Sequence, residues 1–143
     1  MRNRTPTILV ALLVVALAAC ATIQPGQDVI LVNAERDLKI AVGTIDNLFK
    51  VDYDNWQVID PLIPGWKPAV NALRVAAPPT IDAANASIKA YRAALALYRV
   101  DPAQVTQEQL NALATDLGTK IVAAVALGKQ AAAIIAQWKG SGT

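Results

Sequence analysis

The chain has 143 residues, is 55% hydrophobic and carries a formal net charge of +2 at pH 7. Two of its basic residues, Arg2 and Arg4, stand near the start, so the rest of the chain is electrically balanced, and we expect no nucleic-acid partner. It has no histidine and one cysteine, which excludes histidine bases and imidazole metal sites.

The N-terminal segment has the pattern of a secretory signal peptide. Arg2 and Arg4 precede an uninterrupted apolar run over residues 8–19, which ends in small residues before Cys20. As a helix this run would span only about 18 Å, short of the roughly 30 Å hydrocarbon core of a bilayer. An uncleaved N-terminal anchor with an incidental cysteine is therefore the less favoured alternative.

The motif Leu17-Ala18-Ala19-Cys20 resembles the lipobox of bacterial lipoproteins. The resemblance implies that residues 1–19 are removed and that Cys20 carries a diacylglyceryl group and an N-acyl chain, which together make a stable anchor. Residue 21 is Ala rather than the Asp that marks inner-membrane retention, which implies the outer membrane, facing the periplasm. In a host with one membrane, the lipid would lie in that membrane's outer leaflet. Residues 20–27 form a short tether.

The next part of the sequence predicts a long helix followed by an irregular segment. Asp28 is a suitable N-cap for a helix to about Lys50. Its apolar residues recur at steps of three and four: Leu31, Ala34, Leu38, Ala41, Ile45 and Leu48. The prolines of residues 51–68 predict a loop with a turn at Pro64-Gly65, and a short helix should follow from Lys67 or Pro68 to Ala77.

Two further helices complete the predicted fold. Pro78-Pro79 should end the short helix, and Thr80 should cap a third helix that closes at Val100-Asp101-Pro102. The last helix begins either at Pro102 or at Thr106, where Thr-Gln-Glu-Gln is a capping box, and runs to Lys139 with Gly140 as its C-cap. The prediction is an all-α, up-and-down bundle over residues 28–139, with three long helices, one short helix and a tail at 140–143.

The last helix is unusually apolar. Residues 121–128 are apolar on every side, which is typical of a central helix covered by several neighbours. Its small residues Ala124, Gly128 and Ala131 share one face and invite close approach of a second helix. That helix belongs either to the same chain or to another subunit, so a homo-oligomer is one possibility.

Three aromatic residues of the predicted loop, Tyr53, Trp56 and Trp66, are the candidate contact residues. They could form a partner surface, since Trp and Tyr dominate interface hot spots. They could instead close the end of the bundle, which is the favoured interpretation because a small domain needs aromatic burial. A third alternative is contact with the bilayer interface.

The same segment holds the only local cluster of acidic residues, Asp52, Asp54 and Asp60. It lacks the glycine and the closing glutamate of an EF-hand loop, so solvated carboxylates are favoured over a calcium site. The sequence also has no nucleophile elbow, P-loop or dinucleotide-binding motif. We therefore expect no catalytic residue, no metal, and no cofactor other than the covalent lipid.

Together these features predict a non-enzymatic lipoprotein that acts as an interaction or scaffold module of the cell envelope, with an envelope protein as one possible partner. One alternative is an exclusion or membrane-active lipoprotein of the kind that phages and plasmids carry, which the small size permits. A carboxylate-based hydrolase that uses Asp52, Asp54 and Asp60 is the less favoured alternative.

Overall fold

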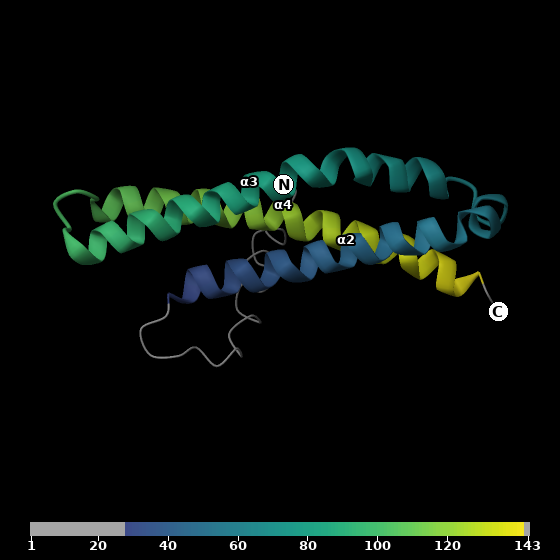
Figure 1. Ribbon diagram of the computed structural model, residues 1–143, viewed down its shortest axis with the longest axis horizontal. Coiled ribbons are helices and arrows are strands. Elements are labelled where there is room, and N and C mark those ends of the chain that lie inside the picture. The colour runs from purple at the N-terminus through teal and green to yellow at the C-terminus, as the bar shows by residue number, and fades with distance from the viewer. Residues whose placement is uncertain (1–27, 142–143) are drawn as a thin grey trace, which may run out of the picture.

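The computed structural model describes residues 28–141, which form three long helices: α2 (Val29–Leu62), α3 (Trp66–Val100) and α4 (Gln107–Gly140). Consecutive helices run antiparallel, with the α2–α3 turn at one end and the α3–α4 turn at the other (Figure 1). No strand occurs within residues 28–141, so the predicted all-α class is confirmed there, with three helices rather than four. The predicted signal peptide, Cys20 and the tether lie outside the described residues.

Two of the three predicted N-caps, Asp28 and Thr106, are present. Asp28 Oδ1 accepts a hydrogen bond from the backbone N–H of Leu31 at 2.9 Å. Thr106 Oγ1 accepts from the Gln109 N–H at 3.2 Å, and Gln109 Oε1 accepts from the Thr106 N–H at 2.8 Å, which completes a capping box. The last helix therefore begins after Thr106, and the alternative start at Pro102 is wrong.

The loop predicted for residues 51–68 is mostly helix, which corrects the sequence-based boundaries. The buried face of α2 continues from Leu48 through Asp52 to Ile59, so burial of these side chains stabilises the helix beyond Lys50. Pro61 lies in the last turn, where its missing N–H frees only one carbonyl, four residues earlier on an exposed part of the helix. The turn itself falls where it was predicted, with Gly65 in the left-handed region at φ 91°.

Pro78 and Pro79 do not end a helix either. They lie inside α3, and Thr80 is no N-cap, because its Oγ1 donates to the Ala76 carbonyl at 2.8 Å. Both prolines are on the exposed side, where water can satisfy the carbonyls that they free, while Ala77 and Ala84 keep the buried face continuous. α3 changes direction near its middle, as proline-containing helices do (Figure 1). The predicted short and third helices are therefore one helix.

α4 packs against both other helices, and its small-residue face meets a helix of the same chain. A Cβ added at Gly128 would lie 3.0 Å from Ala41 Cα, so α2 and α4 approach closely here. The expectation that residues 121–128 are covered on all sides is wrong within this chain, because Val122 is 67% exposed. Gly140 also differs from the prediction, since it is helical and Ser141 is the C-cap.

α4 is the one helix of residues 28–141 that is long and apolar enough to cross a bilayer by length and composition. The helices that form the core of a bundle pass the same test. Here α4 places Leu117, Ala124 and Ala131 fully within the two core clusters that it shares with α2 and α3. α4 is therefore a helix of the bundle.

Candidate functional site

The three candidate aromatic residues occupy different environments at the α2–α3 end of the bundle. Tyr53 is 81% exposed and Trp56 is 48% exposed, both on α2, whereas Trp66 at the start of α3 is 1% exposed. Trp66 packs with Ile59 and Val70 in the core cluster at this end. Of the alternatives weighed from sequence, Trp66 thus fits closure of the bundle, and only Tyr53 and Trp56 present rings to solvent.

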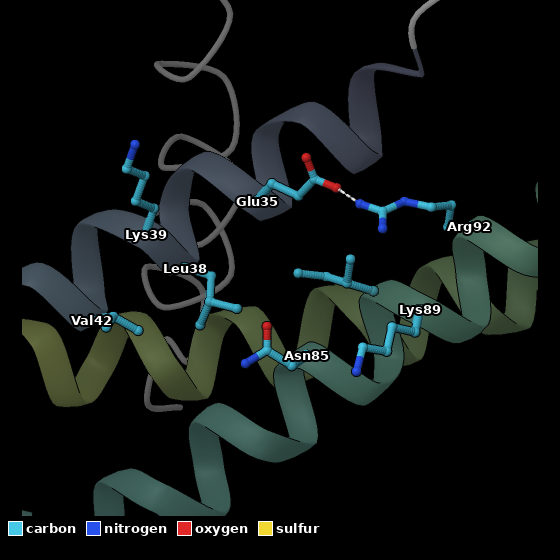
Figure 2. Close-up of a pocket in the computed structure, with 8 residues that line it drawn as sticks. Glu35, Leu38, Lys39, Val42, Asn85, Lys89 and Arg92 are labelled. Carbon is cyan, nitrogen blue, oxygen red and sulfur yellow. Dashed lines mark hydrogen bonds and ion pairs between the residues drawn. The ribbon is translucent and has the colours of Figure 1, made fainter.

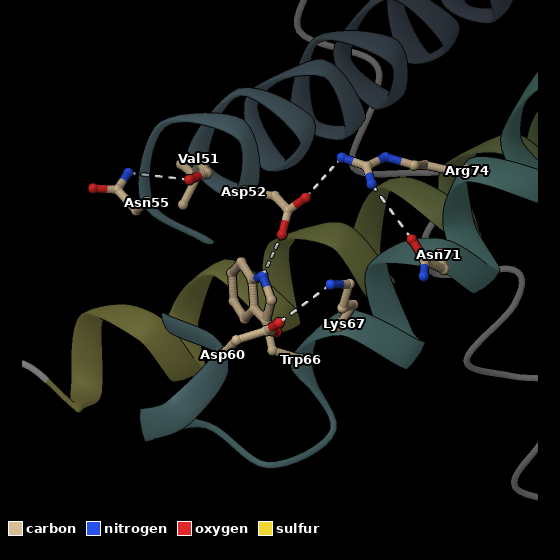
Figure 3. Close-up of polar contacts among 8 residues, drawn as sticks. All are labelled: Val51, Asp52, Asn55, Asp60, Trp66, Lys67, Asn71 and Arg74. Carbon is tan, nitrogen blue, oxygen red and sulfur yellow. Dashed lines mark hydrogen bonds and ion pairs between the residues drawn. The ribbon is translucent and has the colours of Figure 1, made fainter. Parts of the chain in front are cut away.

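Asp52 connects α2 to α3 through Trp66 and Arg74 (Figure 3). Its carboxylate is buried, with Oδ1 accepting from Trp66 Nε1 and Oδ2 accepting from Arg74 Nη2, both at 2.7 Å. A buried carboxylate needs such partners, and the Trp66 indole N–H likewise needs an acceptor. The guanidinium of Arg74 also lies 5.5 Å from the centroid of the Phe49 ring. These contacts hold the turn and the start of α3 in a fixed geometry.

A second cation from α3, Lys67, reaches the exposed part of the same end. Its Nζ lies 3.6 Å from Asp60 Oδ2 and 5.5 Å from the centroid of the Trp56 ring. Because Lys67 is largely exposed, each contact contributes at most about 1 kcal/mol. The contacts therefore contribute little to the stability of the fold.

These side chains enclose a hollow of about 250 Å³, which we call the aromatic hollow; it is lined by Asp52, Tyr53, Trp56, Asp60, Lys67 and Arg74. Two carboxylates and two cations balance, so the hollow has no net charge. Its volume is slightly below the roughly 300–1,000 Å³ typical of small-molecule sites. It can hold a small group or part of an extended ligand.

The acidic residues singled out from sequence do not act together. Asp52 is bonded to Trp66 and Arg74, Asp60 is paired with Lys67, and Asp54 is exposed. Nowhere in residues 28–141 do three acidic side chains come together in a way that could hold a metal ion. Neither the calcium loop nor the carboxylate pair of a hydrolase therefore gains an observation in its favour.

A second open region, which sequence reasoning did not identify, is a groove between α2 and α3 nearer the N-terminus of α2. It has a volume of about 330 Å³, and an ion pair between Glu35 and Arg92 bridges it (Figure 2). Leu38 and Val42 form part of its wall. The feature that could have identified this groove is the ion pair between residues of two different helices. A sequence does not reveal such a pair unless the relative register of the two helices is known.

The N-terminus of α2 is fixed to α3 by a further polar contact. The Tyr91 hydroxyl donates to Asp28 Oδ2 at 3.2 Å, so Asp28 both caps α2 and binds α3. Burial raises the pKa of the Tyr91 phenol, as do the charge of Asp28 and the hydrogen bond to it, while Arg99 opposes the shift. Asp28 therefore fixes the first turn of α2 against α3.

The chain matches no known protein-family model, and no similar protein was found among curated proteins or solved structures. Its function has to be inferred from the N-terminal sequence and from the geometry of residues 28–141.

Proposed function

We propose that the chain is a membrane-anchored extracytoplasmic lipoprotein that acts as a non-enzymatic interaction or scaffold module of the cell envelope. The lipobox resemblance at Cys20 supports the anchor and its outer-membrane location. One structural observation supports the interaction role: Tyr53 and Trp56 present exposed rings on a rigid helix, beside a charge-balanced hollow. Exposed Trp and Tyr on a fixed element are typical of binding surfaces.

The position of this surface favours a component away from the anchoring bilayer. A tether of residues 21–27 can extend at most about 25 Å between the lipid and the start of α2. Tyr53 then lies about 38 Å further along the axis of α2. Contact of its ring with the anchoring membrane would require the bundle to lie flat, whereas an upright bundle presents the surface to the periplasm.

Packing and side-chain chemistry favour binding over catalysis. The chain has no histidine, and the carboxylates at the aromatic hollow are bonded to Trp66, Arg74 and Lys67. Partners of this kind favour a role of these carboxylates in positioning their neighbours. The aromatic hollow therefore has the chemistry of a recognition surface.

The proposal is tested by photocrosslinking in cells from positions 53 and 56, with position 75 as a matched control. Val75 is 78% exposed on α3, so it samples solvent as Tyr53 does, but on a face without aromatic neighbours. We expect adducts with an envelope component from positions 53 and 56 and none from position 75. Equal adducts from all three positions, or no adduct from any, would contradict the proposed role.

A further inference from the structure

We propose that the aromatic hollow binds an uncharged stretch of the cell-wall glycan, with the Tyr53 and Trp56 rings as its stacking platform. This inference rests on the proposed function of the same surface and adds the class of its partner. It follows from three properties of the hollow: its exposed rings, its balanced polar groups and its small extent.

The rings are placed where the flat face of a sugar could pack. Tyr53 and Trp56 are three residues apart on α2, so they lie on adjacent turns of one face, about 5–6 Å apart at their Cβ atoms. Both are exposed, and Lys67 Nζ lies 5.5 Å from the centroid of the Trp56 ring. Sugar rings carry faces of C–H groups that pack on aromatic rings, while their edges carry hydroxyl groups. Tyr and Trp side chains have few rotatable bonds, so they bind such ligands at low entropic cost.

The polar groups around the rings suit hydroxyls rather than ions. Asp60 and Lys67 form an exposed ion pair at 3.6 Å, and the Arg74 side chain is about half exposed beside the buried Asp52. Carboxylate oxygens accept hydrogen bonds from hydroxyls, and ammonium and guanidinium groups donate to them. Because each charge is compensated within the hollow, an anionic or cationic ligand would gain little electrostatic attraction. An uncharged ligand that both donates and accepts fits better.

The extent of the surface favours a glycan over a protein. A stable protein interface needs about 800 Å² on each partner. The exposed aromatic surface covers about one turn of α2. The neighbouring exposed apolar residues Val58 and Leu62 fall on a different side of that helix. Binding of a glycan chain needs only a few aromatic rings that stack on its sugars at any one site.

The test is binding of the full chain, extracted in non-ionic detergent, to two probes: protein-free peptidoglycan sacculi by co-sedimentation, and chitotetraose by calorimetry. We expect binding to both probes and a loss of about tenfold in affinity for Tyr53→Ala and for Trp56→Ala, the effect of one stacked ring. Val58→Ala is the matched control on the same helix and should bind as the parent does. Circular dichroism should show that all three variants remain helical, because each position is exposed.

Absence of binding to both probes, or equal binding by Trp56→Ala and the parent chain, would overturn the glycan inference. A discrete protein adduct from position 56 without glycan binding would overturn it and leave the proposed function standing. Failure of both crosslinking and glycan binding would remove both proposals.

Discussion

α2 and α4 approach closely at Gly128, and Gly128→Ala should destabilise the bundle. A Cβ at this position would lie 3.0 Å from Ala41 Cα and 3.1 Å from Ala41 Cβ. The nearest atom belongs to the backbone of α2, so it cannot rotate away as a side chain can. The two helices must separate by a few tenths of an ångström, or the local packing must distort.

The matched control is Gly118→Ala in the same helix, where an added Cβ meets nothing within 4 Å. Replacing glycine by alanine inside a helix gains about 0.8–1 kcal/mol of helix propensity at both positions. Overpacking a buried contact costs about 1–3 kcal/mol. Gly118→Ala should therefore stabilise the protein, whereas Gly128→Ala should be about 1–3 kcal/mol less stable than that control.

Urea unfolding followed by circular dichroism measures the difference directly, and thermal unfolding should show it as a shift of roughly 4 °C for each kcal/mol. The parent chain and both variants are compared in the same buffer. If Gly128→Ala stabilises the chain as much as Gly118→Ala does, then α2 and α4 do not pack at this distance and the helix register is wrong.

Three further predictions concern other contacts of the bundle. Ala124→Leu should lower the free energy of unfolding by about 1–3 kcal/mol, because Ala124 is fully buried, and an unchanged melting curve would show that its face is open. Asp52→Ala should lower the free energy of unfolding by about 1–3 kcal/mol, because it leaves the Trp66 indole N–H without an acceptor, and Asp52→Asn should lower it less. Equal losses in the two variants would mean that the hydrogen bond from Trp66 to Asp52 contributes nothing. Because folding raises the pKa of the Tyr91 phenol, the phenol contributes to stability below pH 10, and this contribution is lost as the pH rises further. The free energy of unfolding measured from pH 8 to 11 should therefore fall more steeply in the parent chain than in Tyr91→Phe. Parallel profiles would refute the role of this phenol.

The sequence was informative where a local pattern determines local structure. The caps at Asp28 and Thr106 follow from side chains that bond to backbone N–H groups three residues away. The apolar faces predicted for α2 and α4 follow from helical periodicity, and the residues predicted to lie on them are largely buried. The turn at Pro64-Gly65 follows from the special backbone freedom of glycine.

The boundaries failed where tertiary contacts outweigh local preference. Pro78 and Pro79 oppose a helix interior, but burial of Ala77 and Ala84 on the opposite face maintains α3 through them. The prolines of residues 51–68 predicted a loop, but α2 continues to Leu62 because its buried face extends through Asp52 to Ile59. Only the structure shows that the partners of Asp52 are Trp66 and Arg74, which belong to a later helix. For the same reason the sequence could not separate the buried Trp66 from the exposed rings.

The proposed lipid on Cys20 is best tested by intact mass spectrometry of the protein purified from membranes of its host. We expect a mature chain that begins at Cys20 and carries the mass of a diacylglyceryl group and an N-acyl chain, and Cys20→Ala should abolish this processing. A chain that retains residues 1–19, or one with an unmodified Cys20, would refute the proposed anchor.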